Sequence, residues 1–207
     1  VGGYVCEALV RSGVGAFDLV DDDKVCLTNL NRQIIATRKT VGKYKVEVMR
    51  ERILEINPDC DVRVHQCFYL PETRDEFDFS SYSYVVDAVD TVTAKIALVM
   101  QAKETGTPII SSMGTGNKLD PTLLQVTDIS KTSGCPLARV MRRELRARDI
   151  RRLKVVYSPE PAAETRQLEA PSPGRRSVPA SVPWVPSTAG ILMASAIVRD
   201  LIADSED

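Results

Sequence analysis

Short runs of apolar residues alternate along this chain with longer segments in which apolar residues recur every three or four positions. The short runs predict strands at residues 16–20, 61–65, 83–88 and 108–113. The longer segments predict helices that begin near residues 45 and 91, and we expect Pro58 and Gly106 to end them. Alternating strands and helices are typical of an α/β domain with a mostly parallel sheet.

The pattern changes after residue 113. It predicts a strand at 121–130, a basic helix at 136–149 and a further strand at 153–158. Residues 159–186 are rich in Pro, Ser, Ala and Arg and predict a mobile loop, because such a composition buries too little apolar area to offset the entropy lost on ordering. We therefore expect an α/β domain at 1–158, this loop, and a C-terminal helix at 187–207 that docks on the domain or on a dimer partner.

The bulk composition narrows the class of protein. A chain of 207 residues that is 43% hydrophobic can bury one core, and its net charge of -1 gives no overall preference for anionic partners. Its five cysteines include no C-x-x-C pair, which argues against a disulfide framework or structural zinc and favours a reducing cytoplasm. The longest apolar run, at 189–198, is shorter than the roughly 20 residues of a membrane span, so we expect no membrane partner.

Acidic residues follow two of the predicted apolar runs, and ligands bind at the carboxyl ends of strands in open α/β sheets. Asp21 follows the strand at 16–20, where a carboxylate often binds a ribose hydroxyl; an acidic turn in solvent is the alternative. Asp87 and Asp90 follow the apolar residues 84–86. Two interpretations stay open for them, a helix cap and a magnesium ligand beside phosphate oxygens.

Polar side chains suited to phosphate come next along the chain. Arg32 can bind phosphate through two hydrogen bonds, and Lys45 supplies a compact positive charge. With Asn29 and Gln33 they form an ordered polar set that fits a triphosphate, whose charge must be neutralised during transfer. Taken singly, each residue could equally be a solvated surface group.

A resemblance to the ThiF/MoeB-type superfamily of ATP-dependent adenylating enzymes is carried by three segments, "DDDKVCLTNLNRQ", "VGKYKVEVM" and "VVDAVDTVTAK". One branch, the tRNA threonylcarbamoyladenosine dehydratases, is also similar in "ISSMGTGNKLDPT", "VTDISKTSGCPLARVMRREL" and "LKVVYSPE". The resemblance implies a Rossmann-like three-layer fold, ATP and Mg²⁺ as cofactors, a homodimer and tRNA as partner. Whether a sulfur-transfer protein also binds stays open.

The resemblance also implies roles for single residues. The catalytic residues that it implies are Arg32, Lys45 and Asp90, of which Asp90 also binds magnesium. The nucleotide-binding residues that it implies are Gly2, Asp21, Asp23, Asn29 and Gln33. Asp21 would bind the ribose, with Asp23 near the same site, and Gly2 would be the last glycine of the family's G-x-G-G-x-G turn. We therefore expect the first strand and the earlier glycines of that turn to be missing from this chain.

A strongly basic segment spans residues 131–154, where nine basic and two acidic residues give a local charge of +7. Helical spacings of three and four place several arginines on one face, which can follow a phosphate backbone; a solvated surface is the alternative. The residues that we expect to contact tRNA are Lys131, Arg139, Arg142, Arg143 and Arg146.

The resemblance implies that ATP activates the threonine carboxylate of threonylcarbamoyladenosine as an acyl adenylate, after which the neighbouring carbamoyl group closes a ring with net loss of water. Adenylation of the C-terminal glycine of a sulfur-carrier or ubiquitin-like protein is one alternative. A non-catalytic binding module of the same fold is another. A nicotinamide dehydrogenase would also have an α/β pattern, but it leaves Asn29, Arg32 and Lys45 unexplained. Cys135, a lone cysteine, gives no argument for a cysteine nucleophile.

Overall fold

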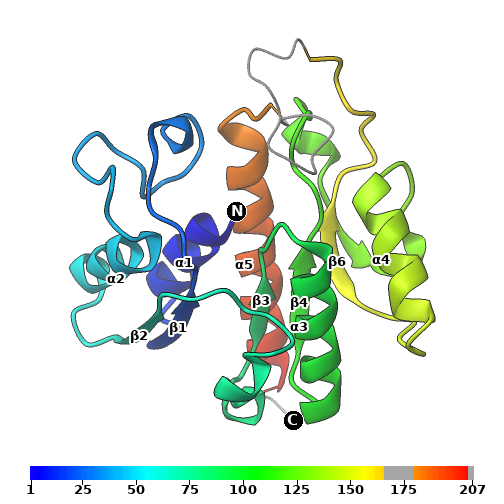
Figure 1. Ribbon diagram of the computed structural model, residues 1–207, viewed down its shortest axis with the longest axis horizontal. Helices are drawn as coiled ribbons and strands as arrows, with labels where there is room; N and C mark the ends of the chain where they lie inside the picture. The colour runs from blue at the N-terminus through cyan, green and yellow to red at the C-terminus, as the bar shows by residue number, and fades with distance from the viewer. Residues whose placement is uncertain (166–179, 205–207) are drawn as a thin grey trace.

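The computed structural model describes residues 1–165 and 180–204 (Figure 1). Residues 166–179, which belong to the predicted loop at 159–186, and residues 205–207 lie outside the described residues. The helices are Gly2–Arg11 (α1), Lys45–Ile56 (α2), Val92–Thr105 (α3), Pro136–Arg146 (α4) and Trp184–Asp204 (α5). The strands are Ala16–Val20 (β1), Asp61–His65 (β2), Val85–Asp87 (β3), Ile109–Ser112 (β4), Gln125–Asp128 (β5) and Lys154–Tyr157 (β6).

The strands form two groups that are mostly parallel (Figure 1). β1 and β2 pair in parallel, with Ala16 opposite Asp61. β3, β4 and β6 form a second parallel group, and β5 lies antiparallel at the edge beside β6. Within the described residues no strand joins β1 to β3. The predicted α/β fold with a mostly parallel sheet is confirmed.

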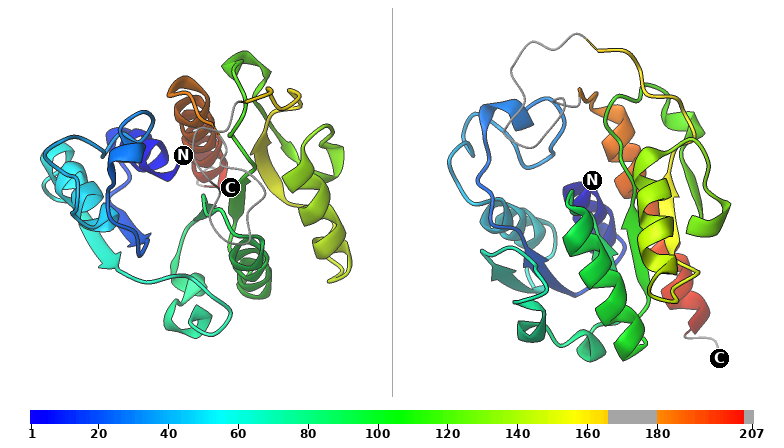
Figure 2. Two further views of the ribbon diagram at one scale, coloured as in Figure 1. Left: turned by 45° about the horizontal axis from the view of Figure 1, so that its top comes forward. Right: turned by 45° about the vertical axis from the view of Figure 1, so that its right-hand side comes forward.

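Helices cover both faces of the group formed by β3, β4 and β6, which gives three layers. Val85, Ile109 and Val155 pack with α3 and α4. Ile110 and Val156 pack on the opposite face with α1 and α5. Neighbouring residues separate in this way because successive side chains of a strand point to opposite faces. Figure 2 shows α3 and α4 on one side of these strands and α5 on the other.

The contact between α1 and α5 requires a glycine. An added Cβ at Gly190 would lie 2.7 Å from the Cβ of Tyr4 and 2.7 Å from the carbonyl oxygen of Val1. Helix α5 also packs against β4, β5 and β6. By length and composition its residues Trp184–Ala203 could cross a membrane, but 44% of their most apolar window is buried in this fold. Met193 and Ile197 of α5 lie in the buried cluster that covers β4 and β6.

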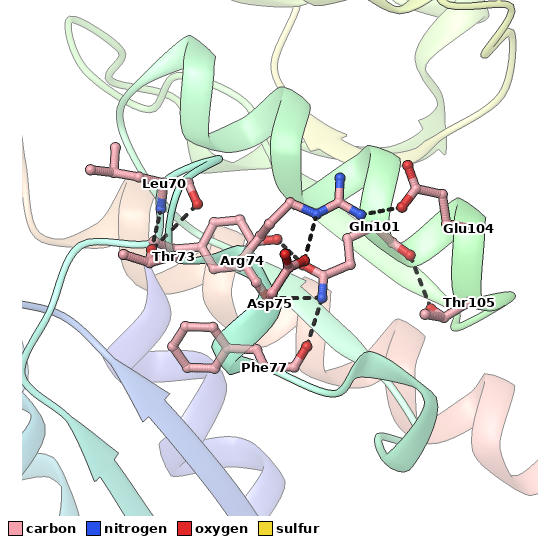
Figure 3. Close-up of polar contacts among 9 residues, drawn as sticks. Leu70, Thr73, Arg74, Asp75, Phe77, Gln101, Glu104 and Thr105 are labelled. Carbon is pink, nitrogen blue, oxygen red and sulfur yellow. Dashed lines mark hydrogen bonds and ion pairs between the residues drawn. The ribbon is translucent and has the colours of Figure 1, made fainter.

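A network of hydrogen bonds attaches the segment between β2 and β3 to α3 (Figure 3). The side-chain amide of Gln101 donates to the carbonyl oxygens of Arg74, at 3.1 Å, and Phe77, at 2.6 Å. The Gln101 carbonyl oxygen accepts from the hydroxyl of Tyr69, and the Arg74 guanidinium pairs with Glu104. The hydrogen-bonding groups of the buried Gln101 amide are therefore satisfied, and the segment between β2 and β3 is held against α3.

Several predicted boundaries differ from the structure by one to four residues, and two of these differences have a clear local cause. The strand predicted at 121–130 begins only at β5, because Pro121–Leu123 forms a 3₁₀ turn in which the side chain of Asp120 accepts from the Thr122 N–H. The C-terminal helix begins at Trp184, before the predicted residue 187. Pro186 does not prevent this start, because the first turn of a helix contains N–H groups that have no intrahelical acceptor.

Candidate active site

The N-terminus of α1 lies between two segments that carry predicted site residues. An added Cβ at Gly2 would be 3.5 Å from the Cβ of Ala88, in the loop that follows β3. An added Cβ at Gly3 would be 3.1 Å from Cγ2 of Ile34, in the segment that follows Gln33. The structure therefore brings the start of the chain, residues near 33 and residues near 88 to one place.

Charged side chains surround this helix terminus. Asp90, Arg32 and Lys45 all lie close enough to the backbone nitrogen of Val1 to act on it electrostatically. The resemblance to the adenylating enzymes implied that these three residues are catalytic. A helix N-terminus with an arginine and a lysine beside it is a favourable place for an anion.

Backbone pairing brings Lys45 to the end of β1. The Val25 N–H donates to the carbonyl of Lys43 at 2.9 Å, and the Lys45 N–H donates to the carbonyl of Asp23 at 3.0 Å. As a result, Nζ of Lys45 lies 2.5 Å from Oδ2 of Asp23 and 3.8 Å from Oδ2 of Asp21. The residues predicted for the ribose side and for the phosphate side of a nucleotide thus adjoin one another.

Asp21 is the more enclosed of the two carboxylates, with 39% of its side chain exposed against 62% for Asp23. Burial raises the pKa of Asp21, while a hydrogen bond from the Asp23 N–H and the charge of Lys45 oppose that rise. The bond from the Asp23 N–H measures 2.8 Å to Oδ1 of Asp21. Asp21 is therefore held in one orientation, with its second oxygen directed to Lys45.

The turn that contains Asn29 and Arg32 is built by its own side chains. Oδ1 of Asn29, a residue only 6% exposed, accepts from the Cys26 N–H at 3.1 Å. The Gln33 N–H donates to the Asn29 carbonyl at 2.9 Å. Nη1 of Arg32 donates to the Thr28 carbonyl at 2.9 Å and to the side chain of Asn31 at 3.0 Å. One edge of the guanidinium is therefore anchored, and Asn29 shapes the turn that anchors it.

Asp87 and Asp90 have different surroundings. Asp87 is fully buried, and its oxygens lie 3.0 and 3.1 Å from Nζ of Lys95, which is itself 1% exposed. The hydroxyl of Ser111 also donates to Asp87 at 2.5 Å. Asp90 is exposed, and residues 1–165 and 180–204 supply it with neither a hydrogen bond nor an ion pair. Of the two, only Asp90 can offer its oxygens to a ligand.

Lys95 was missed by the sequence analysis. Its ammonium binds Asp87 at the end of β3 and also donates to the carbonyl of Ser112, at the end of β4, at 2.7 Å. A signal existed, because Lys95 stands between the small and apolar residues of "TAKIALVMQA", where a solvated lysine is out of place. A lysine in such a helix requires a buried anion nearby, and Asp87 supplies it.

The basic helix α4 differs from the expectation of one exposed arginine face. Arg142 turns inward, and its Nη1 donates to the carbonyl of Thr132 at 2.9 Å. Arg143 is exposed but pairs with Glu144 at 2.7 Å. Lys131, Arg139 and Arg146 are exposed as predicted. The spacing of the arginines placed them on one side of the helix, but it could not show that Thr132 lies against part of that side.

Comparison with known proteins adds independent information. The model of the ThiF family matches residues 1–205. A tRNA threonylcarbamoyladenosine dehydratase of Bacillus subtilis (strain 168) is 42% identical, in an alignment that covers 100% of this chain and 85% of that protein. The protein of the same name from Escherichia coli (strain K12) is 46% identical, over 71% of this chain and 55% of its own length.

Solved structures agree with the sequence comparison. The structure of E. coli tRNA N6-threonylcarbamoyladenosine dehydratase, TcdA, in complex with ATP superposes with a TM-score of 0.88 at 36% identity. That match covers 100% of this chain and 83% of the E. coli chain. The resemblance indicated by the sequence motifs, and the Rossmann-like fold that it implied, are confirmed.

Proposed function

The chain belongs to the ThiF family, and from this premise we propose that it is an ATP-dependent tRNA threonylcarbamoyladenosine dehydratase. The carrying observation is the convergence of Arg32, Lys45 and Asp90 on the N-terminus of α1, in a chain similar over its whole length to an enzyme solved with ATP. Adenylation of a carrier protein is not favoured, since the similar proteins of Bacillus subtilis and Escherichia coli are both named as tRNA threonylcarbamoyladenosine dehydratases.

The geometry supports one orientation of ATP. The ribose hydroxyls bind Asp21 at the end of β1, and the phosphates lie at the N-terminus of α1 beside Arg32 and Lys45. The exposed carboxylate of Asp90 fits a hard divalent cation, because it has oxygen donors and no partner among the described residues. When bound there, magnesium would neutralise charge on the phosphate oxygens.

The first chemical step activates the threonine carboxylate of the modified nucleoside. A carboxylate oxygen attacks the α-phosphorus of ATP, the bond from that phosphorus to the β-phosphate oxygen breaks, and pyrophosphate leaves. Arg32 and Lys45 stabilise the negative charge that develops on the phosphate oxygens. The product is an acyl adenylate, whose leaving group is AMP instead of oxide.

The second step closes the ring. A nucleophilic atom of the neighbouring carbamoyl group attacks the acyl carbon, loses its proton to solvent, and displaces AMP. This attack is intramolecular, and effective molarities of about 10⁵ M or more make a protein nucleophile unnecessary. Cys135 fits that view, because it is only 5% exposed and its sulfur accepts from the Ala138 N–H at the start of α4.

The test uses the full-length enzyme with ATP, magnesium and tRNA that carries threonylcarbamoyladenosine. We expect a nucleoside lighter by one water, with one AMP formed per product. Arg32→Ala should lower the rate by about 10² to 10³-fold, whereas Arg63→Ala, which removes an exposed arginine paired with Asp61, should not. An unchanged nucleoside mass, or pyrophosphate exchange that requires a carrier protein and not tRNA, contradicts the proposed function.

The magnesium site has a separate test. Asp90→Asn keeps the shape of the side chain but removes its charge, so we expect the variant to need a higher magnesium concentration for half-maximal rate. The unfolding free energy should stay within about 0.5 kcal/mol, because Asp90 is exposed. A magnesium dependence identical to that of the wild type would exclude Asp90 as the ligand.

Two further properties remain predictions. We propose a cytoplasmic location, which fits a tRNA-modifying enzyme with five free cysteines. We also propose a homodimer. Helix α5 buries Met193 and Ile197 in the core but exposes 47% of Ile191 and 54% of Ile202. Light scattering on the full-length enzyme should give twice the monomer mass.

A further inference from the structure

We propose that Arg146, Arg151 and Arg152 form a pocket that binds the phosphate backbone of the tRNA, at the end of the fold opposite the ATP site. This inference rests on the proposed function, because it takes tRNA as the substrate. Only Arg146 among these three was expected from the sequence to contact tRNA. The proposed tRNA contact is therefore a defined pocket, and not only the exposed face of helix α4.

The pocket is a hollow of about 460 Å³ between the end of α4 and the start of β6. Its lining consists of Ser130, Arg146, Arg151 and Arg152. All four residues are exposed, and no apolar side chain lines the hollow. Sites for small organic ligands are lined mainly by apolar and aromatic side chains. Three guanidinium groups and a hydroxyl are instead suited to phosphate oxygens.

The guanidinium groups of this pocket are available. Within residues 1–165 and 180–204, Arg146 and Arg151 have neither a hydrogen bond nor an ion pair. Two nearby arginines are not available in the same way, because Arg143 and Arg148 both form ion pairs with Glu144, at 2.7 and 3.2 Å. Three like charges side by side repel one another, and no carboxylate is among the residues that line the hollow, so their proximity favours an anionic ligand.

Arg152 has one acidic neighbour. Burial raises the pKa of Asp128, but hydrogen bonds from Ser130 and Leu153 and the charge of Arg152 outweigh that effect, so this pKa lies below its usual value. Asp128 is therefore ionised at neutral pH, and its oxygens are partly occupied, as by the Ser130 N–H at 2.8 Å. Three positive charges against one negative charge leave the pocket cationic.

The position of the pocket favours a polynucleotide over a small anion as the ligand. Arg151 and Arg152 lie just before the first residue of β6, whereas the ATP site lies at the carboxyl ends of β1 and β3. Helix α4, which begins near the end of β6 and ends near its start, has 11 residues and a length of about 16 Å. A substrate that reacts at the ATP site reaches this pocket only if it is a macromolecule.

A nucleic acid strand along α4 also passes a further free arginine. Arg139 is exposed, has no partner among the described residues, and lies seven residues before Arg146. That separation corresponds to about 10 Å along the helix, a distance that a few nucleotides of one strand can span. The spacing therefore allows one strand to contact Arg139 and the pocket together.

The experiment measures tRNA binding by the full-length enzyme as a function of salt. The triple variant Arg146→Ala/Arg151→Ala/Arg152→Ala is compared with Arg50→Ala/Arg63→Ala/Arg199→Ala, which removes three exposed arginines elsewhere. Each lost phosphate contact should reduce the slope of log K against log salt by nearly one unit, so we expect a reduction of about 2 to 3. At about 0.1 M salt the tRNA affinity should fall by up to roughly 100-fold.

The readouts separate this inference from the proposed function. We expect the pocket variant to bind ATP like the wild type, to show a raised KM for tRNA, and to keep its turnover at saturating tRNA. Wild-type tRNA affinity and salt slope in the pocket variant, or equal losses in the control variant, would overturn the inference. A wild-type enzyme that binds tRNA but does not dehydrate its nucleoside refutes the proposed function alone. Absence of tRNA binding by the wild type refutes the pocket.

Discussion

The buried pair of Lys95 and Asp87 gives the sharpest prediction for this fold. Lys95→Met keeps the length of the side chain but removes the ammonium, which lies 3.0 and 3.1 Å from the two oxygens of Asp87. Both side chains are almost fully buried, at 1% and 0% exposure. Removing one partner of such a pair leaves an uncompensated charge and costs about 3 to 5 kcal/mol.

Two other contacts of Lys95 and Asp87 change the expected loss in opposite directions. Lys95 also donates to the carbonyl of Ser112 at 2.7 Å, and an unsatisfied carbonyl adds about 1 kcal/mol. The hydroxyl of Ser111 still donates to Asp87 and offsets part of the cost. A total near 4 kcal/mol is a large fraction of the 5 to 15 kcal/mol that typically stabilises a domain.

Urea titration followed by circular dichroism measures this loss. Lys103→Met, on the exposed side of the same helix, is the matched control and should change the unfolding free energy by less than about 0.5 kcal/mol. The double variant Asp87→Asn/Lys95→Met removes both charges, and we expect it to recover more than half of the loss. If Lys95→Met costs less than about 1 kcal/mol at an unchanged m value, or if the two single losses simply add, the reasoning is refuted.

Three other changes test the packing and the site. Gly190→Ala should lower the unfolding free energy measured by urea titration. Overpacking against Tyr4 costs about 1 to 3 kcal/mol, which exceeds the helix-propensity gain of about 1 kcal/mol. The control is Gly15→Ala, whose added methyl group meets nothing within 4 Å. Lys45→Ala should reduce ATP turnover by about 10² to 10³-fold, while the unfolding free energy changes by less than about 1 kcal/mol. A loss of less than tenfold in steady-state kinetics would contradict the role of Lys45. Because burial raises the pKa of Asp21, the folded chain binds this proton more readily than the unfolded chain, so the contribution of Asp21 to stability should rise as pH falls through the raised folded pKa. In thermal unfolding from pH 7 to about 4, the unfolding temperature of the wild type should therefore rise relative to that of Asp21→Asn, which should also bind ATP more weakly.

Local patterns were enough to predict most elements. β1 and β2 have the predicted bounds, because each is a short run of strand-forming residues between turn residues. Helix α3 ends where expected, because Gly106 adopts a left-handed conformation with φ of 73° that other residues avoid. The shortened strand β5 shows the limit of this reasoning, because Pro121 and the cap formed by Asp120 override the apolar run that follows them.

Non-local partners could not be predicted. Asp87 could be predicted only as a cap or a metal ligand, because nothing in a linear pattern shows that Lys95 and Ser111 reach the same carboxylate. Periodicity assigns charged residues to the solvent, and it therefore misplaced Arg142, which donates to Thr132. The polar set around Asp21 and Lys45 was found from its order and its resemblance to a family, and not from its geometry.

The pairing of Lys45 explains how one lysine can serve both sides of the proposed ATP site. Its ammonium lies beside Asp23 and Asp21, at 2.5 and 3.8 Å. Asp23 is 62% exposed, and an ion pair with such a partner typically contributes only about 0 to 1 kcal/mol. Hydrogen bonds to phosphate are roughly twice as strong as neutral ones. We therefore propose that arriving phosphates draw Lys45 away from Asp23 at little cost, and that Asp21, relieved of the ammonium, then accepts from the ribose hydroxyls.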